Sequence, residues 1–143
     1  MSYYFIYNLR IAGLMKISDL EHILLNCWCK DTSYDPNKWS KDNPAFGQCA
    51  VTSLIVNDYF AGKIVWAEAL LPDNTKISHY FNLIEEQEVD LTRKQFPKGT
   101  IISKGVDKTK QFSTTREYIL SYQTTRDRYE ILKEKINVCI GNK

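Results

Sequence analysis

The sequence has little net charge and no long apolar segment. Its 143 residues include 19 Lys and Arg against 17 Asp and Glu, a formal charge of +2 at pH 7. So small an excess gives no electrostatic reason to expect binding to nucleic acid or to a membrane surface. No apolar run approaches the roughly 20 residues that a membrane-spanning helix needs. We therefore expect neither kind of partner, and the length predicts one domain with its own hydrophobic core.

The first 14 residues lack the features of a signal peptide. No basic segment precedes their apolar part, and no small-residue cleavage site follows it. A more regular pattern begins at Met15. We therefore treat residues 1–14 as an N-terminal extension without a predicted structure, and residues 15–143 as a single domain.

The few cysteines form no regular disulfide framework. Cys27, Cys29, Cys49 and Cys139 are the four in the chain. Their spacing favours reduced thiols and a cytoplasmic location. Zinc held by the first three cysteines and His79 is disfavoured, because structural sites use C-x(2–4)-C spacing and C-x-C on a helix turns its thiols about 200° apart. We expect no metal and no other cofactor.

Several segments have the apolar spacing of helices. Residues 18–29 begin with a capping box formed by Ser18 and Glu21. Residues 48–60 are apolar on nearly every side, which is typical of a central, buried helix. A short helix starts at Thr114. A last helix, from about residue 124, has an apolar side formed by Tyr129, Leu132 and Ile136.

Other segments alternate as strands do. Residues 64–70 and 77–83 are predicted strands, and His79 shares the inward side of the second strand with its apolar neighbours. A hairpin at 85–87 leads to a further strand, and residues 101–102 form a short edge strand. The sequence thus predicts an α+β fold, in which a buried helix packs on a small antiparallel sheet and further helices flank it at both ends of the chain.

Three residues along this pattern have the chemistry of a thiol enzyme. Cys49 follows a glycine-containing loop at the start of a helix, where unpaired backbone N–H groups favour the thiolate. Of the two histidines, His22 lies off the apolar side of its helix and should be exposed, which leaves His79 as the base. Asp90, across the hairpin, would orient the imidazole. We predict a Cys49–His79–Asp90 triad in this order.

The surrounding residues supply candidates for binding the substrate. The backbone N–H of Cys49 is one possible donor to an oxyanion, and either Gln48 or Asn43 could supply the second. Trp39, in the preceding loop, packs on the domain or covers a cleft. Asn82 is a weaker candidate, because strand alternation turns it away from the histidine.

Each part of the triad also has an ordinary structural explanation. A small thiol packs well at a helix start, a strand histidine is often structural, and Asp-x-Thr commonly forms a local turn or cap. The short chain leaves little material for substrate subsites. The alternative is therefore a catalytically inactive module that binds a peptide or small ligand through Trp39, Tyr80 and Arg93.

Several motifs resemble the YunG-like family of small uncharacterised bacterial proteins. They are NPAFGQCAVTSL at 43–54, HYFN at 79–82, DLTRKQF at 90–96 and RYEIL at 128–132. The likeness extends from about Met15 to about Ile136. It supports the fold and the position of the site more than it supports any particular reaction.

The order of the three candidate residues also resembles the core of the papain and transglutaminase superfamily. There a cysteine begins a helix, a histidine lies on a strand and an Asp-x-Thr-like element follows. The resemblance implies a papain/transglutaminase-like core with Cys49 as nucleophile, His79 as base and Asp90 as orienter. The expected function is a thiol-dependent hydrolase or acyltransferase acting on an amide or (thio)ester of a peptide or small molecule. The oligomeric state stays open.

Overall fold

The computed structural model of the chain describes residues 15–141, and the expectation for the N-terminal extension lies outside them. The helices and strands of the N-terminal half are α2 (Ile17–Cys27), the 3₁₀ turn η1 (Lys30–Thr32), α3 (Cys49–Phe60), β1 (Lys63–Leu70) and β2 (Lys76–Ile84). Those that follow are β3 (Gln87–Val89), η2 (Arg93–Gln95), β4 (Ile101–Ile102), α4 (Thr115–Leu120) and α5 (Gln123–Gly141). The fold is α+β, as predicted.

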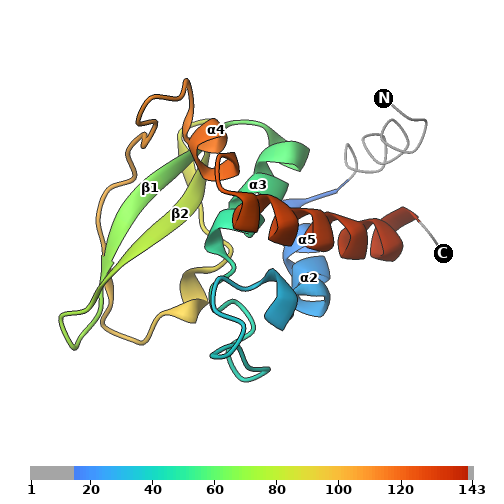
Figure 1. The fold of residues 1–143 in the computed structure, drawn as a ribbon, viewed down its shortest axis with the longest axis horizontal. Coiled ribbons are helices and arrows are strands. Elements are labelled where there is room, and N and C mark those ends of the chain that lie inside the picture. Colours follow the sequence, from blue (N-terminus) through green and yellow to red (C-terminus); the bar gives the residue numbers. More distant parts are fainter. Residues whose placement is uncertain (1–14, 142–143) are drawn as a thin grey trace.

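The sheet is built around one long hairpin. Its four antiparallel strands have the order β3-β2-β1-β4, and β1 pairs with β2 along its whole length, from Lys63 opposite Leu83 to Leu70 opposite Lys76. Figure 1 shows this twisted hairpin on one side of the molecule and α2, α3 and α5 on the other. The predicted edge strand is present as β4, which pairs with the end of β1.

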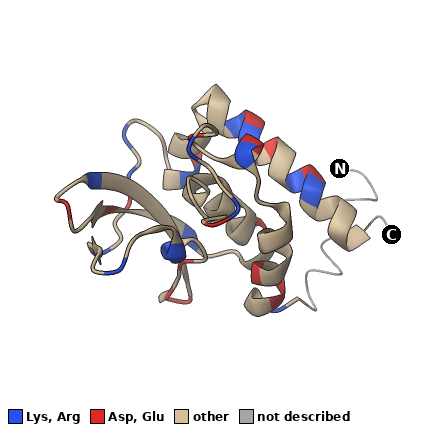
Figure 2. Cartoon of the chain, turned by 90° about the horizontal axis from the view of Figure 1, so that it is seen from below, with Lys and Arg blue, Asp and Glu red and all other residues tan. Residues whose placement is uncertain are grey.

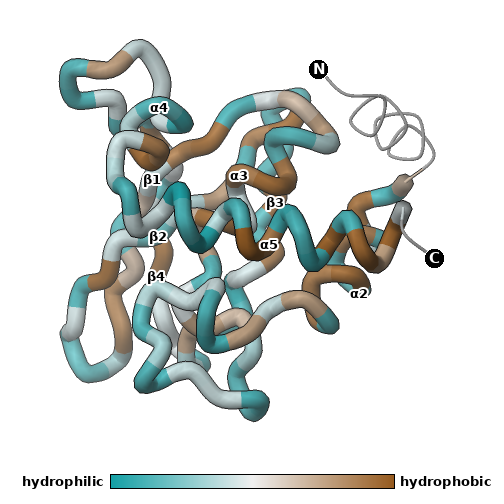
Figure 3. The backbone as a smooth tube through the Cα atoms, turned by 45° about the vertical axis from the view of Figure 1, so that its right-hand side comes forward, coloured by the Kyte–Doolittle hydropathy of each residue, from teal (hydrophilic) through white to brown (hydrophobic). Residues whose placement is uncertain are grey.

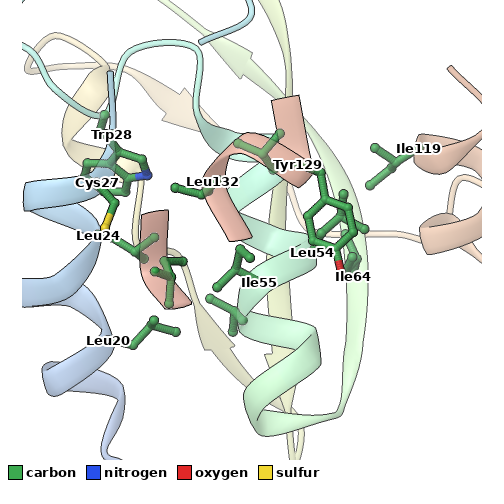
Figure 4. Close-up of a cluster of buried hydrophobic side chains, with 14 residues drawn as sticks. Leu20, Leu24, Cys27, Trp28, Leu54, Ile55, Ile64, Ile119, Tyr129 and Leu132 are labelled. Carbon is green, nitrogen blue, oxygen red and sulfur yellow. The ribbon is translucent and has the colours of Figure 1, made fainter. Parts of the chain in front are cut away.

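The main core lies between the sheet and the helices, with α3 at its centre. Six consecutive residues of α3, from Val51 to Val56, are buried, because α3 contacts the sheet on one side and α5 on another. Apolar side chains of α2, α3 and α5 meet in this core, as Figure 4 shows. The predicted burial of Tyr129, Leu132 and Ile136 is confirmed. Figure 3 shows hydrophobic stretches on each of these helices, alternating on α5 with hydrophilic ones.

A second, smaller apolar cluster covers the opposite face of the sheet. It consists of Val65, Ala67 and Phe81, with two partly buried neighbours. Gly105 closes over it so tightly that a Cβ there would lie 2.5 Å from Val65 and 2.8 Å from Phe81. His79 pairs across the sheet with Ala67, so it belongs to this face. On the predicted inward side of β2, His79 and Phe81 are therefore buried, but under the loops after β3 rather than under α3, and Ile77 near the start of the strand is exposed.

The start of α2 differs from the prediction. The backbone N–H of Lys16, the N-cap residue, donates to Asp19 Oδ2 at 2.9 Å, so this pair caps the helix in place of Ser18 and Glu21. An acidic residue in the first turn also interacts favourably with the helix dipole. His22 is exposed, as expected.

The outer surface carries charges of both signs. Figure 2 shows Lys or Arg and Asp or Glu interspersed along α5. Within residues 15–141, no helix has the length and apolar character needed to cross a membrane.

Candidate functional site

The loop before α3 places Cys49 at the first residue of the helix. Gly47 has φ +72°, and a Cβ on it would lie 2.3 Å from Ser33 Oγ, so only glycine fits there. The backbone N–H of Tyr34 donates to Gly47 O at 2.8 Å and fastens the loop to the segment after η1. Cys49 is half-buried. As the first helical residue, it presents a backbone N–H that has no partner within the helix.

His79 and Asp90 form a buried pair beside the end of β3. The β2–β3 register sets Asn82 opposite Val89, so Asp90 comes next on the face of the sheet that carries His79. His79 Nε2 donates to Asp90 Oδ2 at 2.7 Å, and the two side chains are 0% and 6% exposed. The backbone N–H of Thr92 donates to the other carboxylate oxygen at 3.3 Å.

Aromatic side chains fix the imidazole in place. The ring of Phe96 meets the His79 ring edge to face at 4.9 Å between centroids, and the ring of Phe81 lies 5.8 Å away. Packing of this kind restricts the rotamer of His79. It therefore holds Nε2 on the carboxylate and directs Nδ1 the other way.

The thiol of Cys49 interacts with this histidine. Burial by itself lowers the pKa of His79, but the hydrogen bond to Asp90 and the neighbouring Cys49 thiol raise that pKa to about 9. Because Nε2 is engaged by the carboxylate, Nδ1 is the ring nitrogen left for the thiol. Nδ1 is buried and has no aligned hydrogen-bond partner among the described residues. Contacts between a nucleophile and its base are often loose before substrate binds and tighten afterwards.

The amides considered as oxyanion donors also hold the loop in place. Gln48 is completely buried and its Nε2 donates to Cys29 O at 3.0 Å, while its Oε1 has no partner within the described part of the chain. Asn43 Nδ2 donates to Gln95 O at 3.0 Å, and Gln95 Oε1 accepts from the backbone N–H of Gly47 at 3.2 Å. Each amide therefore has one N–H engaged in positioning the loop.

Trp39 and Asn82 likewise have structural partners. Trp39 Nε1 donates to Pro44 O at 3.0 Å and so braces the loop before the cysteine. Asn82 Nδ2 donates to Ser53 O at 3.0 Å, because its side of β2 faces α3. Strand alternation does turn Asn82 away from the histidine, as expected, and the structure uses it to attach β2 to α3.

The residues of the binding-module alternative belong to three different parts of the fold. Tyr80 packs against the main core on the α3 side of β2, and burial is the largest of the effects that raise its pKa. Arg93 is exposed on η2. Trp39 braces the loop before α3. Among residues 15–141, no hydrogen bond, ion pair or ring contact joins these three side chains to one another.

Arg128, near the start of α5, is a site neighbour that the sequence reasoning missed. It interacts electrostatically with Cys49, and burial lowers its pKa. A usable signal was present: Arg128 lies three residues after Thr125 and four before Leu132, both buried, so the helical period places it beside the buried side of α5.

A pocket of about 250 Å³ lies at the other end of α3. Its lining includes Asn57, Lys63, Asp107 and Arg116. Since α3 has 12 residues, its ends are about 18 Å apart. This pocket is therefore separate from the cysteine site. Within residues 15–141, no group of three or more His, Cys, Asp or Glu side chains is arranged to hold a metal ion.

Comparison with known proteins places the chain among relatives of undefined activity. The model of the YunG protein family matches residues 16–141. A Bacillus subtilis (strain 168) protein named "Uncharacterized protein YunG" is 31% identical over 80 residues, which are 54% of this chain and 60% of that protein. The matched region thus spans about three fifths of the relative's length. No solved structure matches the chain significantly.

Proposed function

The chain belongs to the YunG family, and we propose that it is a cysteine-dependent hydrolase or acyltransferase with a papain- or transglutaminase-like core. The substrate would be an amide or (thio)ester of a peptide or small molecule. The observation that carries the proposal is the single buried imidazole that interacts with a carboxylate at Nε2 and with the Cys49 thiol.

The raised pKa of His79 fits the resting state of such an enzyme. With a pKa of about 9, the ring is protonated at neutral pH and holds two N–H groups. One donates to Asp90, and the other is available to a thiolate on Cys49. An ion pair of this kind keeps the nucleophile ionised below the usual thiol pKa of about 8.5.

The reaction then proceeds in two steps. Cys49 Sγ attacks the carbonyl carbon, and the backbone N–H of Cys49 donates to the oxyanion that forms. The proton on His79 Nδ1 passes to the leaving amine, alcohol or thiol, which departs and leaves a thioester on the enzyme. Neutral His79 next takes a proton from water or from an acceptor amine, whose attack on the thioester releases the product and regenerates the thiolate of Cys49 beside protonated His79.

A second candidate is the catalytically inactive binding module. The complete burial of His79 favours it, because a histidine closed off from solvent can serve as a purely structural partner of Asp90. In that case Cys49 is an ordinary thiol, and His79 stabilises the fold without taking part in chemistry.

Alkylation of Cys49 by iodoacetamide as a function of pH separates the two candidates. Peptide mapping by mass spectrometry gives the rate for each cysteine separately, so the partly exposed Cys29 serves as an internal reference. For an enzyme we expect the Cys49 rate to reach its plateau well below pH 8.5. His79→Gln should move the profile to that of a free thiol, whereas His22→Gln, which changes the only other histidine, should leave it unaltered. An ordinary profile that neither variant changes would refute the proposal.

Turnover is the complementary test. A panel of activated esters, thioesters and amides should include at least one that the wild-type protein cleaves and that Cys49→Ser does not. Such a result would also eliminate the inactive module.

A further inference from the structure

Arg128 is a half-buried cation without a paired anion. Its guanidinium makes only long contacts, Nη1 to Thr32 O at 3.5 Å and Nη2 to Thr125 Oγ1 at 3.4 Å. Arg116 illustrates the usual arrangement, since it forms an ion pair with Asp58 at 2.8 Å. No acidic side chain within residues 15–141 forms such a pair with Arg128.

The contacts of Arg128 place it near the loop that leads to Cys49. Its guanidinium lies 5.9 Å from the ring centre of Tyr34. The backbone N–H of Tyr34 in turn donates to Gly47 O, two residues before Cys49. Arg128 and Cys49 are accordingly close enough for their charges to interact. The arginine therefore borders the helix start at which an acyl substrate would react.

Removing part of an arginine from water without supplying an anion costs free energy. A planar guanidinium with free N–H groups is also the side chain best suited to bind a carboxylate through two hydrogen bonds. Tyr34, beside Arg128, is 79% exposed and Arg128 itself is partly exposed, so an anion in solution can reach the guanidinium. The cost of the unpaired cation would be recovered when an anion binds.

We propose that Arg128 binds a carboxylate of the substrate, and that the preferred acyl substrates therefore carry a free carboxylate close to the reacting carbonyl. This inference rests on the proposed function. It adds a specificity-determining residue and a substrate class to the Cys49–His79–Asp90 site.

Two alkylating reagents test the inference without knowledge of the natural substrate. Iodoacetate and iodoacetamide transfer the same carbon to a thiolate and release the same iodide ion, but only iodoacetate carries a carboxylate. The ratio of their rates at Cys49 therefore measures recognition of that carboxylate. Cys139, which is exposed, provides the ratio for a thiol outside this site, measured in a Cys27→Ser background because the Cys139 sulfur otherwise lies 3.7 Å from that of Cys27.

We expect the iodoacetate-to-iodoacetamide ratio at Cys49 to exceed that at Cys139 by about tenfold, the effect of one hydrogen bond between charged groups. Arg128→Met should reduce the Cys49 ratio to the Cys139 value. Arg126→Met removes the same charge from an exposed position of α5 and should retain the high ratio. Arg128→Lys, which keeps the charge and loses the planar guanidinium, should give an intermediate ratio. This conservative variant also covers the case in which Arg128→Met does not fold.

The possible outcomes are distinct. If Arg128→Met slows both reagents equally, the arginine only stabilises the thiolate and the carboxylate proposal is wrong. If His79→Gln alters the Cys49 profile but Arg128→Met leaves the ratio unchanged, the carboxylate proposal fails and the proposed enzyme stands. If Cys49 behaves as a free thiol in every variant, both fail.

Discussion

Raising the pH from 6.5 to 9.5 should destabilise this protein through His79. The ordinary pKa of a histidine is 6.5, and in the folded chain the pKa of His79 is about 9. The folded state therefore holds the proton more tightly than the unfolded state. The resulting stability is fully present below pH 6.5 and is lost as the pH rises through 9. The pKa difference of about 2.5 corresponds to about 3 kcal/mol, a substantial part of the 5–15 kcal/mol typical of a domain.

Chemical denaturation followed by tryptophan fluorescence measures this effect. We expect the free energy of unfolding of the wild-type protein to fall by about 3 kcal/mol across the range. Other groups also titrate above pH 8, so the informative quantity is the difference between variants. His22→Gln should follow the wild-type curve, because His22 is exposed. His79→Gln should be less stable at pH 6.5 and should lack the histidine-dependent part of the slope.

A direct measurement covers the case in which His79→Gln does not fold. Titration of the imidazole C–H signals by NMR gives the pKa of each histidine in the intact protein. Cys49→Ala should lower the pKa of His79, because the thiol is one of the groups that raise it. A His79 signal that titrates near 6.5, or a pH slope equal in His79→Gln and wild type, would refute the electrostatic picture of the site.

Two further predictions concern the framework around the site. Gly47→Ala should reduce the free energy of unfolding by about 2 kcal/mol in thermal or chemical denaturation, because its new Cβ meets Ser33 at 2.3 Å at a positive φ. Gly99→Ala also has positive φ, but its nearest contact is 3.4 Å, so it should cost less. The sulfurs of Cys27 and Cys139 lie 3.7 Å apart, so oxidised glutathione should convert them to a disulfide, read as the loss of two hydrogen masses and abolished by Cys27→Ser.

Local patterns were sufficient to predict the elements that carry Cys49, His79 and Asp90. The apolar run of α3 has helical length, and a helix so apolar has to lie at the centre of the core. The alternation of β1 and β2, together with a short connection to β3, predicts adjacent antiparallel strands. Hairpin pairing then brings Asp90 to the strand that carries His79, since their separation along the chain matches the register observed. Sequence order and strand period together account for this part of the site.

Other features of the site depend on tertiary packing and could not be predicted from local sequence patterns. Alternation indicated which residues of β2 share a side with His79, but both sides of β2 are buried, so alternation did not reveal which of them faces α3. Arg128 comes from the last helix and reaches the site only because α5 packs beside η1. Gln48 and Asn43 were considered for their amide donors, and their backbone partners became visible only once the loop was folded.

The burial of His79 raises the question of why a structural histidine would need a thiol beside it. Asp90 and the packing of Phe81 and Phe96 are already sufficient to fix the ring. A purely structural pair would gain by giving Nδ1 a backbone carbonyl or a hydroxyl, since a buried nitrogen without a partner costs free energy. Here Nδ1 is buried without an aligned partner, and the group that interacts with the ring is the thiol at the start of α3. That cost is explained if Nδ1 holds the proton that the reaction at Cys49 transfers. The enzyme is therefore the stronger of the two candidates.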